Sequence, residues 1–385
     1  MSNNVKTYMS SDNGAPAMIA QSAGQMLAIL DAVLVNGYNS NTITITRDGT
    51  VATASCTDSR FRSGACVLIE GANQTEYNGE KYITSSGNDW FTFQVSGSPA
   101  TPATGTITAK VAPAGWTKPF SGTNKGVYRL GGGNQRYLRI DDAISGACGP
   151  FYGRMVGYES MTDVDTGTGK FPQQTQVTDG LYFYRSNNST PRMWMAFATD
   201  RHLYLFVNSS GNSNGTYDLC WFFGDLKARN PTDAFSTLII GPTNGSTNYE
   251  AFQQQGNIRN STGCDGHYMC RSYTGVANAV KVGKFGDLSF ASSLSEQMGR
   301  NGAAYPNPTD GALFMSPVTV YEPGNYCVRG SLPGLWAPLH NLALNPFDTL
   351  DGTGDLEGKS FLCLSSSYST LSGEFLIETS NTWDL

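Results

Sequence analysis

The chain has 385 residues, a formal net charge of −6 and only 15% charged residues. An acidic balance provides no basic surface for nucleic acid, and three histidines leave few groups for proton transfer near neutral pH. The 44 glycines, with abundant Ser, Thr and Asn, favour a mainly β fold with many turns. We expect several small antiparallel β-sandwich or barrel domains with one N-terminal helix.

Residues 1–40 are predicted to form an extended arm followed by that helix. Its apolar positions approximate a helical stripe, made of Met18, Ile19, Met26, Leu27, Leu30, Val33 and Leu34. Pro16 suits the first turn, and Asn36-Gly37 suits the C-terminal stop. Polar residues within the segment predict that it does not span a membrane. The N-terminus lacks the apolar core of a signal peptide, so we expect no signal peptide. The helix packs either on a β-domain or on a neighbouring subunit.

Residues 41–112 are predicted to form an inserted small β-barrel module. Residues 43–54 contain two alternating runs joined at Asp48-Gly49, which is a hairpin signal. Residues 91–110 contain further alternating runs bounded by Pro and Gly. No candidate catalytic group recurs in the module, which favours a role in presenting surfaces.

Residues 113–385 are predicted to form a β-rich main domain, on which residues 1–40 are able to pack as well. Residues 180–184, 193–198 and 202–207 have the pattern of consecutive strands, and residues 199–201 suit a tight hairpin turn between the last two. The meander is predicted to continue through two more strands, at residues 218–226 and 234–240. The tripeptide Phe-Gly-Asp occurs at both 223–225 and 285–287, which is too short to indicate a duplication.

Several acidic or glycine-rich segments are candidate sites. Asp141-Asp142 has the residue types of a glycosidase pair, but adjacent strand residues point to opposite faces, so a turn after a strand is the preferred interpretation. Residues 163–169 and 351–357 lack the full ligand set of a calcium loop and are predicted to be turns. Residues 131–133, three glycines, lack the Lys-Ser/Thr of a phosphate loop.

The eight cysteines include no CxxC pair; they are Cys56, Cys66, Cys148, Cys220, Cys264, Cys270, Cys327 and Cys363. Cys264, His267 and Cys270 have a spacing that common zinc sites do not use, and a fourth ligand is not evident. The other histidines are His202 and His340. Free thiols are the preferred interpretation, and disulfides formed later in an oxidising exterior are the alternative. We therefore expect no catalytic, cofactor-binding or metal site and no enzyme.

Several segments resemble a family of tailed-bacteriophage virion proteins. They are residues 15–38, residues 115–129, the strands around Trp194 and Tyr204 followed by residues 222–225, and residues 329–340. The module, especially residues 71–79, is similar to small β-barrel modules that phage structural proteins carry as insertions. Such modules usually have His-Gly-Phe where this chain has Ser59-Arg60-Phe61, a departure that concerns a turn.

The resemblance implies a structural subunit of a phage virion, assembled in the bacterial cytoplasm as a symmetric homo-oligomer. It leaves open a place in the neck or collar, tail or baseplate, or on the capsid. The implied partners are other virion proteins, namely tail, neck, portal-proximal or capsid subunits, with no nucleic acid and no membrane. Host-receptor binding, to a surface glycan, is the alternative. Its aromatic platform could use Trp194, Tyr204, Trp221 and Phe222, for which core packing is the ordinary explanation.

Overall fold

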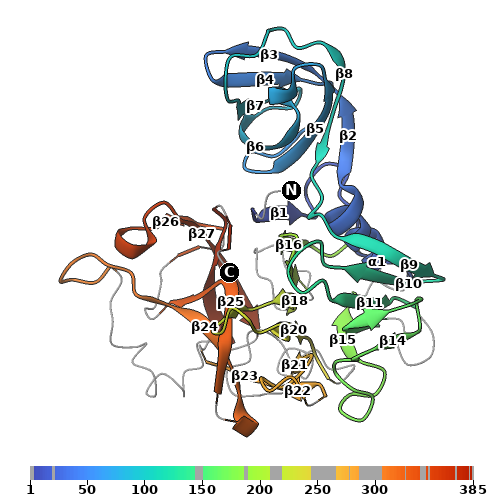
Figure 1. The fold of residues 1–385 in the computed structure, drawn as a ribbon. Coiled ribbons are helices and arrows are strands. Elements are labelled where there is room, and N and C mark those ends of the chain that lie inside the picture. Colours follow the sequence, from blue (N-terminus) through green and yellow to red (C-terminus); the bar gives the residue numbers. More distant parts are fainter. Residues whose placement is uncertain are drawn as a thin grey trace.

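The computed structural model describes most of the chain, as residues 4–19, 22–143, 151–185, 190–208, 219–243, 266–276, 278–285, 306–325, 327–338, 344–345, 347–368, 371–380 and 382–383. The fold is mainly β with several antiparallel sheets and one helix of 12 residues near the N-terminus, which confirms the predicted fold class. Figure 1 shows a body of layered sheets from which a separate barrel projects.

The central sheet of the body is buried on both faces. In spatial order its strands are β1 (Lys6–Met9), β16 (Trp194–Ala198), β17 (His202–Val207), β18 (Leu219–Asp225), β20 (Thr237–Ile240), β21 (His267–Met269) and β22 (Val280–Lys281). Alternate residues of one strand enter different cores: Leu203 and Leu205 face one cluster, while Tyr204 and Phe206 face the other. The predicted hairpin at residues 199–201 is confirmed by the pairing of Ala198 with Leu203.

A five-stranded sheet covers one of these faces. Its strands are β9 (Thr117–Gly122), β10 (Lys125–Arg129), β11 (Tyr137–Asp141), β12 (Tyr152–Tyr158) and β15 (Leu181–Tyr184), with a small hairpin of β13 (Ser160–Met161) and β14 (Gly167–Thr168). Its Leu138 and Ile140 share a core with Leu203 of the central sheet. Residues 181–184 do form a strand, but it pairs with β12 and not with its neighbour in sequence, β16.

A C-terminal sheet covers the other face. Its strands are β23 (Gly283–Phe285), β24 (Met315–Glu322), β25 (Cys327–Pro338), β28 (Leu371–Glu378), β27 (Ser360–Tyr368) and β26 (Thr349–Asp351), and β19 (Lys227–Ala228) pairs with β25. Two short 3₁₀ turns, η4 (Pro323–Asn325) and η5 (Gly354–Leu356), connect its strands. Leu335 and Phe375 from this sheet pack with Tyr204 and Phe206. The body is thus three sheets thick.

The helix is shorter than the sequence predicts. It comprises α1 (Gln25–Leu30), continued by a π-helical segment, η1 (Asp31–Asn36). The predicted start at Pro16 is wrong: Gly24, with φ 83°, precedes the helix, and Met18 pairs in a β-bridge with Arg192. The predicted stop is confirmed, because Gly37 takes φ 71° and its N–H donates to the Ala32 carbonyl at 2.9 Å.

The projecting barrel is one sheet folded round on itself. Its spatial order is β2 (Tyr38–Thr42), β8 (Gly105–Val111), β5 (Cys66–Ala72), β6 (Gly79–Ser86), β7 (Trp90–Gln94), β4 (Val51–Ser55) and β3 (Thr44–Asp48), with a 3₁₀ turn, η2 (Thr75–Tyr77). The first and last strands are consecutive in the chain, and the N–H of Ile43 donates to the Ile107 carbonyl at 3.0 Å. Because Ile43 lies between the two edge strands and Ile107 lies in β8, this bond ties the point where the edges meet to the rest of the sheet.

The sequence pattern explains the barrel locally. The predicted hairpin at Asp48-Gly49 is confirmed, since Asp48 pairs with Val51 and Gly49 takes φ 57°. Alternating residues such as Ile45 and Phe91 fill the interior, while their neighbours face solvent. The chain enters the barrel at Tyr38 and leaves it at Val111. Whether the barrel folds as an independent domain stays a prediction.

Candidate functional site

The N-terminal strand β1 joins the barrel to the body. Lys6, whose side chain is 2% exposed, donates from Nζ to Glu80 Oε1 at 2.6 Å and to the Pro113 carbonyl at 2.7 Å. Tyr8 donates from its hydroxyl to the Ala112 carbonyl at 2.9 Å. Because β1 also pairs with β16, one short strand holds the central sheet, the barrel and the chain that leaves the barrel.

Further contacts surround this joint on the barrel side. Arg62 donates from Nε to Asp12 Oδ1 at 2.7 Å and from Nη2 to the Thr7 carbonyl at 2.8 Å. The Tyr38 hydroxyl donates to the other oxygen of Asp12 at 2.8 Å, and the Tyr82 hydroxyl donates to the Val5 carbonyl at 2.9 Å. Burial raises the pKa of both tyrosines, so they stay neutral donors. These bonds fix the barrel at several points.

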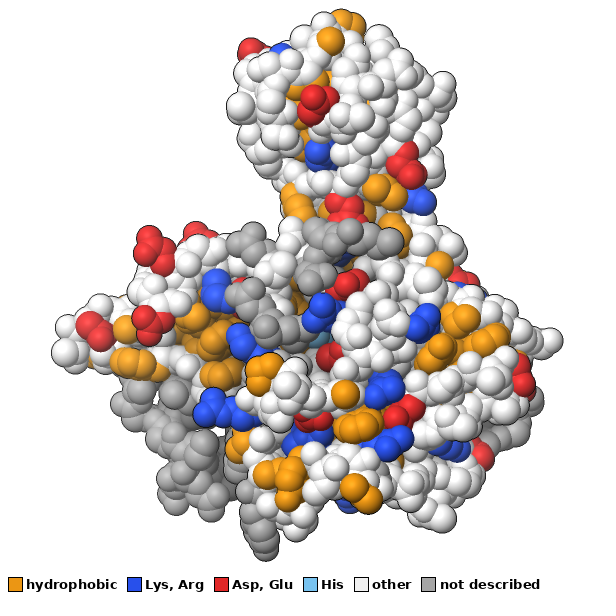
Figure 2. Space-filling model, in the orientation of Figure 1, with side chains coloured by type: hydrophobic (Ala, Val, Ile, Leu, Met, Phe, Trp, Pro, Cys, Tyr) orange, Lys and Arg blue, Asp and Glu red, His pale blue; other side chains and the backbone are white. Residues whose placement is uncertain are grey.

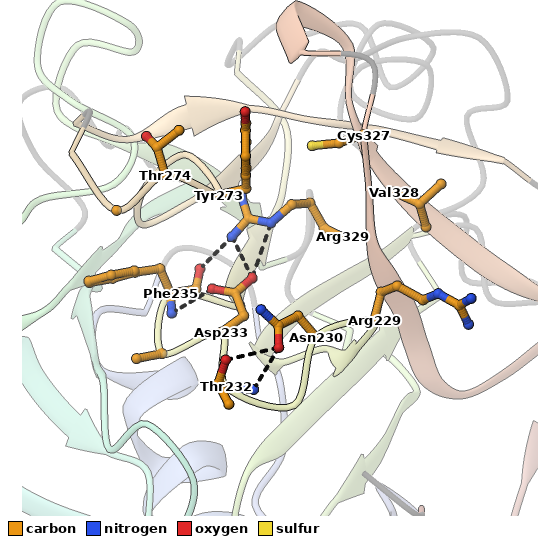
Figure 3. A pocket seen from close by; sticks show the side chains of 12 residues that line it. Arg229, Asn230, Thr232, Asp233, Phe235, Tyr273, Thr274, Cys327, Val328 and Arg329 are labelled. Atoms are coloured by element: carbon orange, nitrogen blue, oxygen red, sulfur yellow. Dashed lines mark hydrogen bonds and ion pairs between the residues drawn. The ribbon is translucent and has the colours of Figure 1, made fainter.

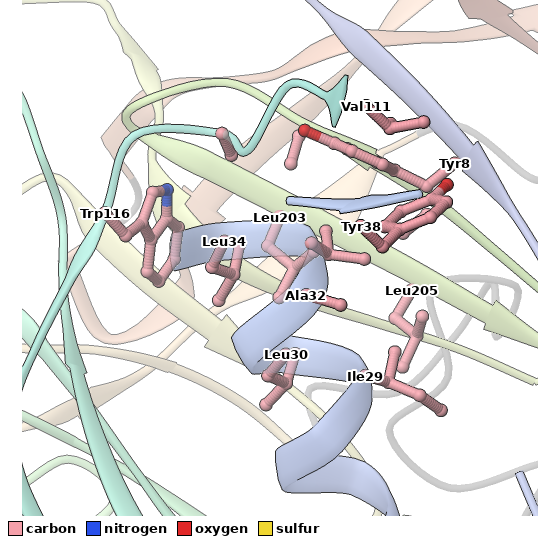
Figure 4. Packing of buried hydrophobic residues seen from close by; sticks show 14 of the residues in the cluster. Tyr8, Ile29, Leu30, Ala32, Leu34, Tyr38, Val111, Trp116, Leu203 and Leu205 are labelled. Carbon is pink, nitrogen blue, oxygen red and sulfur yellow. The ribbon is translucent and has the colours of Figure 1, made fainter. Parts of the chain in front are cut away.

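The helix supports the joint from below (Figure 4). Ile29, Leu30 and Leu34 are fully buried and share a core with Leu203 and Leu205 of the central sheet. The helix therefore packs on its own β-body, which is the first of the two positions predicted for it. At its C-terminal end, residues 114–116 donate backbone N–H groups to carbonyls of the helix.

A pocket of about 380 Å³ opens where the loop after β19, the loop after β21 and the start of β25 meet (Figure 3). Arg329 lies at its centre with its side chain 2% exposed. It donates to Asp233 Oδ2 from Nε at 3.1 Å and from Nη2 at 2.8 Å, and to Glu322 Oε2 from Nη1 at 2.9 Å. Its remaining N–H groups reach the carbonyls of Arg271 at 3.0 Å and Phe235 at 3.3 Å.

All five donors of the Arg329 guanidinium are thus used inside the protein. Glu322 accepts three further bonds, from Ser272 Oγ at 2.7 Å, from the Tyr273 backbone N–H at 3.1 Å and from Asn325 Nδ2. These donors hold the pKa of Glu322 below its usual value, against the opposing effect of its desolvation, so the pair is charged. Arg329 is therefore a clamp between the loops and the C-terminal sheet, and not a free ligand donor.

The Asp141-Asp142 pair does not have the geometry of a glycosidase pair. Asp142 is fully buried and pairs with Arg185, whereas Asp141 lies on the opposite face near Lys125 and Arg139. Asp142 follows strand β11, so the two adjacent side chains diverge, as expected from the alternation of a strand. The two carboxylates share no cleft.

The predicted turn at residues 163–169 has a clear local cause. Asp163 Oδ1 accepts the backbone N–H groups of Asp165 at 2.7 Å and Thr166 at 2.9 Å, which closes the β13–β14 turn. Within residues 351–357, Asp351 instead ends strand β26 and accepts a bond from Ser360 Oγ of the paired strand β27 at 2.8 Å, while Gly354–Leu356 forms the 3₁₀ turn. Within the described residues, no three His, Cys, Asp or Glu side chains form a group that could hold a metal ion.

The triple glycine at residues 131–133 packs closely against other parts of the chain. A Cβ on Gly131 would lie 2.2 Å from the Gly115 carbonyl oxygen, and a Cβ on Gly133 would lie 2.0 Å from Asp225 Oδ2. Asp225 packs against this turn and accepts the backbone N–H of Asn134 at 2.9 Å. The glycines therefore serve close packing.

The cysteines and histidines of the described residues are mostly buried. The described cysteines are free thiols, namely Cys56, Cys66, Cys220, Cys270, Cys327 and Cys363. Burial raises the pKa of both Cys66 and Cys270 to about 12, which makes these thiols unreactive near neutral pH. His202 and His267 are buried. Cys148, Cys264 and His340 lie outside the described residues, so the Cys264–Cys270 spacing is not tested.

The four candidate residues of a stacking platform are core residues, with Trp194, Tyr204 and Phe222 at 0% exposure and Trp221 at 3%. The sequence gives no sign of the joint residues Lys6 and Glu80. Lys6 is a lone lysine in a short strand, and its partner lies 74 residues away, so no local pattern could reveal the pair.

No protein-family model matches this sequence, and the comparison with curated proteins finds no match either. Among the described residues, no helix has the length and apolar character needed to cross a bilayer.

Proposed function

We propose that this protein is a structural subunit of a tailed-bacteriophage virion, present in symmetric copies and bound to other virion proteins. The sequence segments that resemble phage virion proteins are the first support for this assignment. The observation that carries it furthest is the joint around Lys6, by which a barrel is fixed to a layered β-body. Such an arrangement suits a protein that acts through shape and repeated contacts.

The architecture suits a protein that must stay folded and unaggregated outside a cell. A barrel whose sheet edges are joined exposes little unpaired strand edge, which limits unwanted association of strands. The barrel stands clear of the body in Figure 2, and its surface is largely uncharged and polar. A module held away from the body in this way can reach a neighbouring subunit or the exterior of a particle.

The test is localisation on purified particles. A short epitope inserted at the Gly49 turn should leave the barrel intact, because a Cβ on Gly49 would meet no other atom within 4 Å. Quantitative mass spectrometry of washed, infectious particles should find the chain in a fixed number of copies. Antibody labelling of the tagged particles should decorate one symmetric location in electron micrographs. Absence from washed particles that remain infectious would overturn the proposal.

A further inference from the structure

The outer face of the five-stranded sheet carries a row of charges. Register places Lys125 of β10 opposite Asp141 of β11, Asp141 opposite Arg154 of β12, and Arg154 opposite Tyr182 of β15. Opposed residues of neighbouring strands share a face, so the four side chains form a ladder. The neighbouring row on the same face includes Arg139, which is paired in register with Val156.

A pocket of about 370 Å³ lies over this face, here called the β11–β12 pocket. Its cationic lining residues are Lys125, Arg139, Arg154 and Lys170. Its acidic lining residues are Asp141, Asp165 and Asp179. Four cations against three carboxylates leave a surplus of one positive charge, in a chain whose net charge is −6. The pocket therefore attracts anions against the overall charge of the protein.

Several donors in the β11–β12 pocket remain unused by the described residues. Arg139 donates from Nε to the Val164 carbonyl at 2.8 Å, and from Nη2 to Asp165 Oδ1 at 2.5 Å and Asp141 Oδ2 at 3.4 Å, which leaves Nη1 without a bond to a described residue. Lys170 uses one of its three donors, toward Gln174 Oε1 at 2.6 Å. The hydroxyl of Tyr158, at the same pocket, makes no hydrogen bond to a described residue. A ligand that accepts bonds would satisfy all three groups.

An unused acceptor lies beside these donors. Asp179 accepts a bond from Gln174 Nε2 through Oδ1 at 3.0 Å, and its other oxygen accepts none from the described residues. The floor is part apolar, since Val156 and the ring of Tyr158 line it. A sugar ring combines these needs, because its hydroxyls donate and accept while its C–H face packs on an aromatic edge. The volume also lies within the range of small-ligand sites.

We propose that the β11–β12 pocket binds an anionic sugar residue of a surface polysaccharide. Its acidic group, the carboxylate of a uronic acid, lies between Arg139 Nη1 and Lys170 Nζ, and a ring hydroxyl donates to Asp179. This binding role goes beyond the proposed structural function and does not depend on it, since purified protein is enough to test it.

The experiment titrates the full chain with glucuronic and galacturonic acid and follows binding by ligand-observed NMR and calorimetry. Glucose and galactose serve as neutral controls, and glucose 6-phosphate and inorganic phosphate separate the sources of the negative charge. We expect the uronic acids to bind and the neutral sugars not to, with affinity that falls as salt is raised. If glucose 6-phosphate bound and the uronic acids did not, the proposal of a uronic acid would be overturned, and the negative charge of the ligand would be assigned to a phosphate group.

Lys170→Gln tests the pocket itself, because Lys170 makes a single hydrogen bond to the described residues and its loss leaves the sheet untouched. We expect about tenfold weaker binding, as for the loss of one charged hydrogen bond. Lys227→Gln, which removes an exposed lysine outside the pocket, should leave binding unchanged. The proposal is overturned if no anionic sugar binds, or if the neutral sugars or inorganic phosphate bind as tightly as the uronic acids. It is also overturned if the two variants have the same affinity for the uronic acids.

Discussion

Asp142 and Arg185 form an ion pair in which neither side chain reaches solvent, with 2.5 Å between Oδ1 and Nη1. The second oxygen of Asp142 accepts the backbone N–H of Met26 at 2.8 Å, in the first turn of the helix. Gly24 has no side chain to cap the helix, so the carboxylate of Asp142, which follows strand β11, caps it instead. One buried pair thereby ties the helix to the five-stranded sheet.

Asp142→Asn should destabilise the protein by about 3–5 kcal/mol, because the Arg185 charge would stay buried without its counterion. The amide oxygen can still accept the Met26 N–H, so the loss reports the charge more than the cap. Urea unfolding measures the difference. Asp141→Asn is the control, since Asp141 is 19% exposed and its loss should cost at most about 1 kcal/mol. Equal losses in the two variants would contradict the burial argument.

Lys6→Met should loosen the barrel without unfolding it. The change removes the bonds to Glu80 and to the Pro113 carbonyl, at a cost of about 2 kcal/mol at the joint. Hydrogen exchange should quicken at residues 79–83 and 112–114, while the central sheet keeps its protection. Lys81→Met removes a bond from Nζ to the Glu76 carbonyl, the one it makes to the described residues, and should leave the joint unchanged. Unaltered exchange in the Lys6 variant would show that the remaining bonds of the joint hold the barrel in place without Lys6.

Gly133→Ala and Gly49→Ala separate backbone strain from close packing. Both glycines have almost the same backbone φ, 58° and 57°, so both substitutions carry the cost of a left-handed alanine, about 1 kcal/mol. Only at Gly133 does the new Cβ also meet Asp225, and this adds roughly 1–3 kcal/mol. Thermal and urea unfolding of the two variants should therefore differ. Matching stabilities would mean that the triple-glycine turn can shift freely.

His202 should make stability depend on pH. Burial lowers its pKa from 6.5 to about 3 in the folded protein, so the unfolded chain binds the proton first as the pH falls. Stability is therefore lost on acidification between these two values, by about 1.4 kcal/mol per pH unit. His202→Asn keeps an atom that can bond to Thr199 but cannot titrate. Unfolding free energies from pH 7 to pH 4 should fall less steeply for this variant, and parallel curves would refute the assignment.

Local structure can be predicted from the sequence wherever a turn or an alternation sets it. Asp48-Gly49 and residues 199–201 join strands as predicted, and Gly37 ends the helix, because these features depend on a few adjacent residues. The start of the helix depends on a distant residue instead. Pro16 is compatible with a first turn, but the cap comes from Asp142, which lies 116 residues from Met26.

The sequence by itself determined a mainly β protein with one N-terminal helix, a hairpin-rich segment after it and few groups suited to catalysis. Only the tertiary structure decided that strand β15 leaves its neighbour β16 for another sheet, that Lys6 joins Glu80, and that Arg329 joins Asp233 and Glu322. Side-chain alternation and turn preferences act over a few residues. Ion pairs and pockets depend on which strands become neighbours, and this order is set by the packing of whole sheets against a common core.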